Sequence, residues 1–201
     1  MNIGYKKLQN DYIAKLEILG KTNENRQDIA DPQHAKYRTS KAKVLKIFKN
    51  GKCGIRIIKQ MNGLYNPSFM YIAGKEIYVS DYDEDVNNVC SRGIHYFKTP
   101  YQAKMWELND DNYTGKYIEW YDNGNIQEEG EYKNGKKEGK WTWWWADGNK
   151  KEEGEYKNGE DNGKWTGWYD DDNKMYEREY KDGKWIWLYG QKNMESLCNI
   201  M

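Results

Sequence analysis

One cysteine and one histidine, Cys90 and His95, lie five positions apart and are the pair best suited to covalent chemistry. A thiol acts as a nucleophile when a neighbouring imidazole takes its proton or lowers its pKa, which requires hydrogen-bond reach in the fold. The other interpretation is that Cys90 ends a loop while His95 packs in a sheet or caps it. Because neither a second cysteine–histidine pair nor an orienting acid is evident, the sequence predicts no enzymatic activity.

Acidic residues recur at positions 81–87 and resemble the start of a calcium-binding loop. The sixth position of such a loop needs glycine but is Val86, and the twelfth needs a bidentate glutamate but is Arg92. A solvated acidic loop is therefore expected. Zinc is not expected, because His34 and His95 are the only histidines and no CxxC motif occurs. The sequence predicts no metal and no cofactor, since its glycines fall in turns and not in a phosphate-binding loop.

The segment between Asp31 and Glu76 contains ten basic residues and no acidic one. Such a charge run attracts the phosphates of membrane lipids or nucleic acids. The candidates for anion binding within its basic stretch, residues 36–59, are Lys41, Lys43, Lys46 and Lys49. The alternative is an ordinary solvated hairpin face, whose charge is balanced by the acidic loop at 81–85 or by the acidic repeat domain. Too few aromatic residues accompany the lysines to form a base-stacking platform.

Composition limits these possibilities. The 201 residues include 32 basic and 32 acidic side chains, so the net charge is zero, which excludes a uniformly cationic nucleic-acid binder. Ten tryptophans and 18 tyrosines, with few aliphatic residues, predict an aromatic core. The charge balance changes from basic to acidic near residue 112. We therefore expect one domain at 1–112, a repeat domain at 113–190 and a tail at 191–201.

An internal repeat of 24 residues occupies the second half of the chain. Asn-Gly or Asp-Gly dipeptides occur about twice per period and suit tight hairpin turns, and the segments between them are rich in tryptophan and tyrosine. The pattern predicts a single meandering antiparallel sheet without helices, in which equivalent aromatic residues form ladders. The expected ladders are Trp120, Trp144 and Trp168; Tyr117, Trp141, Trp165 and Trp185; and Tyr132, Tyr156 and Tyr180.

The segment from Gly130 to Trp141 resembles a MORN repeat, whose core reads glycine, aromatic, Asn-Gly, glycine, aromatic, and the segment from Gly154 to Trp165 repeats the match. The extra tryptophans at 143–145 make it similar to the MORN-like repeats of some bacterial antitoxins. The resemblance implies a repeat sheet with a role in scaffolding, in protein binding or in binding acidic phospholipids.

The sequence pattern of residues 1–112 predicts an α+β domain. Residues 43–48 and 53–58 read as a hairpin around Asn50-Gly51, and residues 70–73 and 76–80 as a second hairpin around Gly74. A short strand is expected at 93–97, followed by a helix at 100–108 with an N-cap threonine and a capping-box glutamine. The stretches around residues 36–44 and 90–103 resemble an uncharacterised domain of proteins from large DNA viruses that infect amoebae. That resemblance covers about 12–108 and implies a viral origin but no activity.

No secretory signal and no membrane-spanning run is evident, and the widely spaced Cys53, Cys90 and Cys198 imply no disulfide framework. An intracellular location is therefore expected. The predicted function is a non-enzymatic interaction or scaffold protein that binds a protein partner through Trp120, Trp144 and Trp168. These side chains are expected on the face opposite Trp141, because a single sheet cannot bury both faces in itself. Three alternatives stay open: the 36–59 segment binds membrane lipid or nucleic acid; Cys90 and His95 form a thiol enzyme; or the N-terminal domain, or a second copy of the chain, covers the tryptophans.

Overall fold

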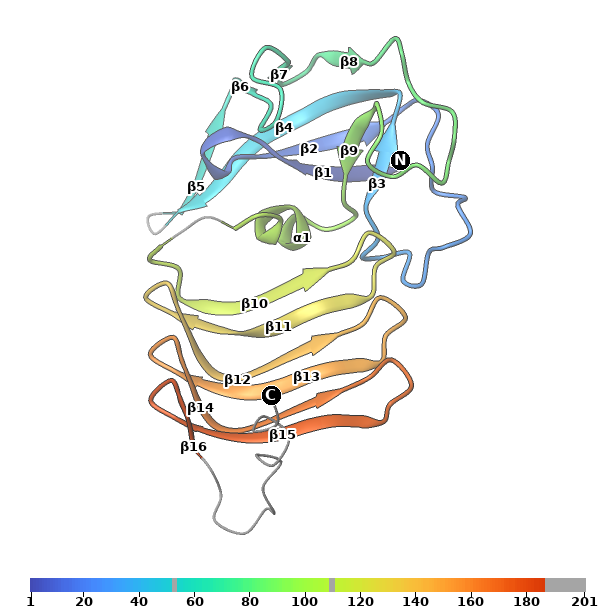
Figure 1. Ribbon diagram of the computed structural model, residues 1–201. Coiled ribbons are helices and arrows are strands. Elements are labelled where there is room, and N and C mark those ends of the chain that lie inside the picture. The colour runs from blue at the N-terminus through green and yellow to red at the C-terminus, as the bar shows by residue number, and fades with distance from the viewer. Residues whose placement is uncertain (52–53, 109–110, 187–201) are drawn as a thin grey trace, which may run out of the picture.

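The computed structural model describes residues 1–51, 54–108 and 111–186, and Figure 1 shows two parts arranged one above the other. The N-terminal region (residues 1–108) forms the upper part and the repeat sheet (residues 115–186) the lower part. Helix α1 (Pro100–Met105) lies between them. The expected tail at 191–201 and two of the three cysteines, Cys53 and Cys198, lie outside the described residues.

Strands make up most of the N-terminal region. They are β1 (Ile3–Lys7), β2 (Ile13–Ile18), β3 (Tyr37–Thr39), β4 (Lys41–Gly51), β5 (Gly54–Ile58), β6 (Gln60–Asn62), β7 (Met70–Ile72), β8 (Glu76–Tyr78) and β9 (Ile94–Tyr96), and a 3-10 helix (Gln9–Asp11) joins the first two. The main sheet has the order β1-β2-β4-β5 with β8 also on β4, while β3–β9 and β6–β7 form separate pairs. The predicted α+β class is only partly right, because α1 is a six-residue helix in a region otherwise built of strands.

The core of the N-terminal region lies on one face of the main sheet. Side chains alternate along a strand, so every second residue of β2 and of the first part of β4 is buried there, and a register shift between β2 and β4 brings Ile47 onto the same face. These residues are Ala14, Leu16, Ala42, Val44 and Ile47. The opposite face presents Ile13 and Phe48. Phe97, which precedes α1, and Ala103 of α1 pack on these two residues. This second cluster places α1 between the main sheet and the repeat sheet.

Helix α1 begins where the sequence indicates. The hydroxyl of the N-cap Thr99 accepts a hydrogen bond from the backbone N–H of Gln102 at 3.2 Å. The helix ends at Met105, before the expected end at residue 108. The Gln102 side chain does not complete a capping box. It is buried and donates to the backbone carbonyl of His34, which attaches the helix to the loop before β3.

One of the two expected hairpins is present. β4 pairs with β5, but Asn50 and Gly51 belong to the ladder and do not form the expected turn. Residues 52–53 lie outside the described residues. The second expected hairpin is wrong, because β7 pairs with β6 and β8 pairs with β4. The N–H of Gly74 donates to the carbonyl of Val44 at 2.7 Å, which directs the chain onto β4 and prevents a β7–β8 pairing.

The repeat sheet consists of β10 (Gly115–Trp120), β11 (Ile126–Lys133), β12 (Lys136–Trp144), β13 (Lys150–Lys157), β14 (Glu160–Trp168), β15 (Lys174–Lys181) and β16 (Lys184–Ile186). These described strands form one antiparallel sheet in chain order, which confirms the predicted meander. In the turns at Asn134-Gly135 and Asn158-Gly159 all four residues have positive φ. Hairpin turns of this type need that conformation, which asparagine and glycine tolerate.

One face of the repeat sheet, called here the aromatic face, contains a continuous stack of rings. Its successive members are Tyr117, Trp141, Trp143 and Trp165, with centroids 5.9, 5.9 and 5.7 Å apart. Trp141 is fully buried and Trp165 is 5% exposed, so the inward placement predicted for these two residues is confirmed. The indole of Trp141 lies on Gly130 of the neighbouring strand, where any Cβ would overlap the ring.

Consecutive repeats are also connected at their turns by hydrogen bonds that recur every 24 residues. The side-chain amide of Asn125 donates to the carbonyl of Ala146 at 2.9 Å. In the next repeat Asn149 donates in the same way to the carbonyl of Asp170 at 2.8 Å. Each turn is therefore held to the following turn by an asparagine, in addition to the backbone ladder.

Candidate interaction site

Trp120, the first of the three tryptophans expected to bind a partner, is buried where the two parts of the protein meet. Its ring stacks on His34 with centroids 5.1 Å apart and an interplanar angle of 1°. Tyr101 of α1 meets the same ring edge-on at 6.0 Å. With 9% of its surface exposed, Trp120 belongs to the core and not to an accessible surface.

Trp144 and Trp168 are half-buried and lie on the face opposite the aromatic face, called here the groove face. A groove of about 550 Å³ runs along this face beside Trp144. Thr142, Glu129 and Lys140 are among its other lining residues. The structure thus brings only the second and third of the predicted tryptophans to an accessible position.

The charges of the groove face form a repeating pattern. Glu153 accepts ion pairs from Lys150 at 2.8 Å and from Lys140 at 3.1 Å. One repeat later Glu177 pairs with Lys174 at 2.6 Å and with Lys164 at 2.8 Å. Hydrogen bonds from Lys164 and Lys174 lower the pKa of Glu177 to about 2. Each glutamate is therefore ionised between two lysines.

The aromatic face has its own internal cation. The Lys137 ammonium lies 3.9 Å from the ring centroid of Trp141 and 4.7 Å from that of Trp143, and it pairs with Glu128 at 3.3 Å. Glu128 also accepts a hydrogen bond from Trp143 Nε1 at 2.6 Å. The most electron-rich part of this face is thus already occupied by a side chain of the protein.

The four lysines predicted to bind anions have partners within the N-terminal region. Lys41 pairs with Glu76 at 2.7 Å, and Lys49 pairs with Asp11 at 3.4 Å. Lys43 lies opposite Glu17 and Glu76 in the strand ladders, and the Lys46 ammonium lies 5.9 Å from the Phe48 ring. Carboxylates therefore offset part of the positive charge of this segment.

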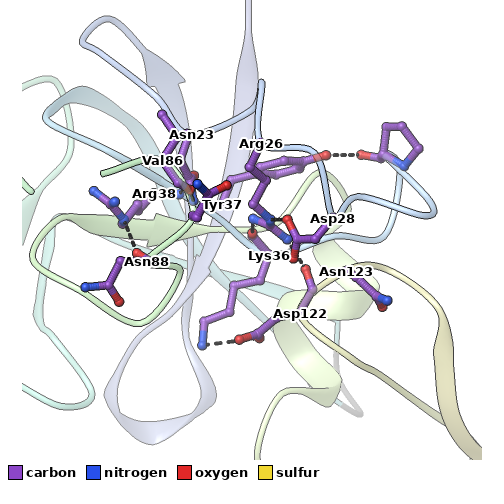
Figure 2. Close-up of polar contacts among 12 residues, drawn as sticks. Asn23, Arg26, Asp28, Lys36, Tyr37, Arg38, Val86, Asn88, Asp122 and Asn123 are labelled. Atoms are coloured by element: carbon purple, nitrogen blue, oxygen red, sulfur yellow. Dashed lines mark hydrogen bonds and ion pairs between the residues drawn. The ribbon is translucent and has the colours of Figure 1, made fainter. Parts of the chain in front are cut away.

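A fifth basic residue of the same segment, Arg38, is fully buried and organises the acidic loop. Its guanidinium donates to the backbone carbonyls of Asp83 and Asp85. It also donates to the carbonyl of Asn88 at 2.8 Å, the bond that Figure 2 shows. The loop thus turns its carbonyl groups toward an internal arginine. Among the residues that the structure describes, no three His, Cys, Asp or Glu side chains are grouped so that they could hold a metal ion.

Cys90 and His95 line one cavity but do not form a hydrogen bond with each other among the described contacts. The Nε2–H of His95 donates to the carbonyl of Val89 at 2.9 Å. Burial, followed by the charge of Lys6, lowers the pKa of His95 to about 4, so the imidazole is neutral at pH 7. The Cys90 sulfur is instead 3.5 Å from the ammonium of Lys36.

The junction between the two parts contains a network that local sequence patterns did not indicate. Arg26 is 4% exposed and donates from Nε to Asp28 at 2.7 Å, from one terminal nitrogen to the carbonyl of Lys36 at 2.5 Å, and from the other to the carbonyl of Asp122 (Figure 2). The N–H groups of Ala30 and Lys36 donate to the same turn of the repeat sheet. The sequence around these residues gives no sign of the network, because most of the acceptors are backbone carbonyls, which every residue has.

The fold and the repeating turns define a MORN-type repeat protein with an additional N-terminal domain. Residues 113–134, 137–158 and 161–182 each match the MORN repeat variant, and MORN repeats are generally involved in binding or scaffolding. Residues 1–103 match a family of unknown function, DUF5758, and since this match covers more than half of the chain, the protein belongs to that family. Neither is a family of enzymes.

Searches among curated proteins and among solved structures found no match. No helix in the described part of the chain is both long enough and apolar enough to cross a membrane.

Proposed function

We propose that this protein is a non-enzymatic interaction protein whose protein partner docks on the groove face of the repeat sheet, at Trp144 and Trp168. The observation that carries the proposal is the accessibility of these two rings, while their equivalent Trp120 is buried. Trp144 lines the groove, and the Trp168 ring lies 5.3 Å from the ammonium of Lys150, another lining residue. Half-exposed tryptophans beside a concavity are the side chains that most often dominate the binding energy of protein interfaces.

The two faces of the sheet differ in what they offer a partner. On the aromatic face the rings stack on one another, and the Lys137 ammonium lies over Trp141. The groove face combines accessible indole surface with ion pairs at its edge, an arrangement similar to the apolar centre and polar rim of protein interfaces. The division into domains at 1–112 and 113–190, the intracellular location and the viral origin remain predictions from the sequence.

The test compares the full-length protein with the double variant Trp144→Ala/Trp168→Ala as baits after chemical crosslinking in cell extract. A protein retained by the wild type and lost from the double variant, with little change in melting temperature, supports the proposal. Tyr78→Ala is the matched control, since Tyr78 is 70% exposed in the N-terminal region. Equal retention by wild type and double variant, or a drop in melting temperature as large as that of Trp141→Ala, contradicts the proposal.

A further inference from the structure

A cavity of about 390 Å³ lies in the N-terminal region between β1, β9 and the segment that follows α1. Three lysines, Lys6, Lys7 and Lys36, line it together with Cys90 and His95. The remaining lining residues are apolar or aromatic, apart from one carboxylate, and comprise Leu64, Tyr65, Phe97, Trp106 and Glu107. The cavity therefore combines an excess of positive charge with an apolar wall.

Two of the three ammonium groups are already coordinated by the protein. Lys7 donates to the carbonyls of Trp106 and Glu107 at 2.8 and 2.9 Å. Lys36 lies 3.6 Å from a carboxylate oxygen of Asp122 and 4.2 Å from the Trp106 ring. Both side chains are thus held in place, and they shape the positive end of the cavity.

Lys6 differs from these two, because its ammonium has no hydrogen-bond or ion-pair partner among the described residues. Its side chain lies on the core face of β1, opposite Ala14 of β2. Burial, reinforced by the charge of Lys36, lowers the pKa of Lys6 from 10.5 to about 8. At pH 7 the amine is still mainly protonated, so a positive charge faces the cavity without a counter-charge.

His95 next to Lys6 does not supply that counter-charge. Its Nε2–H is used by the Val89 carbonyl, and the neutral ring leaves Nδ1 as an acceptor without charge. The single carboxylate of the lining, Glu107, is exposed and interacts with the hydroxyl of Tyr65. A partly buried ammonium without a carboxylate costs stability, and an anion bound beside it removes that cost.

We infer that this cavity is a binding site for a small organic anion, with Lys6 as the principal contact and Lys36 as a second cationic contact. The anionic group is a phosphate or a carboxylate, both of which accept charge-assisted hydrogen bonds from ammonium groups. The body of the ligand is apolar or aromatic, because Leu64, Phe97 and Trp106 line the same cavity as the lysines. A second cavity, also of about 390 Å³, shares Lys6, Leu64, Tyr65 and His95 with the first and gives room for a larger body.

The full-length protein is titrated by calorimetry at low ionic strength with four probes: phenyl phosphate, benzoate, inorganic phosphate and benzyl alcohol. Binding of phenyl phosphate or benzoate at least about tenfold more tightly than of benzyl alcohol is expected, because the alcohol lacks the charge. The ratio of phenyl phosphate to benzoate affinity then identifies the anionic group. Absence of binding by every anion, or equal affinity for the alcohol and the anions, overturns the inference.

Two variants make the assignment specific. Lys6→Met is expected to fold, since it removes a buried charge and keeps the length of the side chain, and to weaken anion binding by about tenfold or more. Lys75→Met removes an exposed lysine outside the cavity and is expected to leave the affinity unchanged. Equal weakening by the two substitutions, or no weakening by Lys6→Met, overturns the role of Lys6.

Discussion

Arg26 of the N-terminal region donates a hydrogen bond to the backbone carbonyl of Asp122 in the first turn of the repeat sheet. The equivalent carbonyls one and two repeats later, those of Ala146 and Asp170, accept side-chain amides from the preceding repeat. Arg26 therefore occupies the position that an asparagine would take in a repeat placed before the first one. The N-terminal region closes this end of the array as a cap, which repeat proteins need where stacking ends.

Substitution of Arg26 by methionine is expected to lower the free energy of unfolding by about 2–4 kcal/mol, because two backbone carbonyls at the junction and the Asp28 carboxylate lose a buried charged donor. Lysine at the same position is expected to restore little of this loss, since it cannot direct donors to three separate acceptors. Urea denaturation measures the change, with the exposed Arg56→Met as the matched control. A loss no larger than that of the control variant would show that the cap contact is unimportant.

The asparagines of the turns give a second prediction. Asn149→Ala removes the bond to the Asp170 carbonyl and is expected to cost about 1 kcal/mol. Among the described residues, the side-chain amide of Asn173, one repeat later, donates to Asp171 in its own turn and not to a neighbouring turn, so Asn173→Ala is expected to cost less. Thermal unfolding of both variants tests the difference. Equal costs would mean that the asparagines act within turns and not between them.

The third prediction concerns the tryptophans of the aromatic face. Trp141→Ala removes a fully buried indole and is expected to cost about 3–5 kcal/mol. Trp185 was expected in the same ladder but is 49% exposed on the last described strand, so Trp185→Ala is expected to cost less than about 1 kcal/mol. Chemical denaturation of the two variants gives the comparison. A similar cost for both variants would contradict the expectation that tryptophans at the centre of the sheet stabilise the fold more than a tryptophan on the last described strand.

Acid is expected to destabilise the protein through His95. Its folded pKa is about 4 because burial and the nearby lysines oppose its charge, whereas the unfolded imidazole takes up a proton below about 6.5. The unfolded state therefore binds more protons between these values, and the free energy of unfolding falls by up to about 3 kcal/mol as pH drops from 6.5 to 4. His95→Gln keeps a donor for Val89 and should flatten this part of the profile. An unchanged slope in the variant would assign the effect to other groups.

Lys6→Met is expected to raise the free energy of unfolding at pH 7 by about 1–2 kcal/mol in the absence of any anion. Below pH 8 the folded protein holds an ammonium that the unfolded chain hydrates more favourably. Above 10.5 the amine is neutral in both states, so the gain disappears as pH rises from about 8 to 10.5. Titratable groups that face Lys6 across the cavity are Lys7, Lys36, Tyr65, Cys90, His95 and Glu107. Denaturation at pH 7 and pH 10.5 measures the gain, and a variant less stable than wild type at pH 7 would contradict it.

The repeat sheet could be predicted from the sequence because each of its strands pairs with its neighbour along the chain. The positions of the turn dipeptides and the period of the aromatic residues are therefore enough to predict the strand order of this sheet. In the N-terminal region, several strands pair with partners that are distant in the sequence. β3 pairs with β9 across more than fifty residues, and β8 leaves its neighbour β7 to join β4, and neither pairing has a local signal.

The candidate site was only partly predictable for a related reason. Trp120, Trp144 and Trp168 are equivalent in the sequence, and their different exposure depends on what stacks against each end of the array. Lys36 and Arg38 belonged to a run of basic residues that suggested a surface. The fold buries Arg38 and turns Lys36 inward, because backbone carbonyls and Asp122 are available to them there.

The chain-order pairing of β10 to β16 has a consequence for protein synthesis. The ribosome completes the N-terminal region before the first repeat appears, so a folded template already exists when β10 emerges. From β11 to β16, each strand pairs with the strand synthesised just before it, so no later segment has to insert between two strands that have already paired. The direction of translation is therefore also the direction of assembly, which limits the time that aromatic edges stay exposed to other nascent chains.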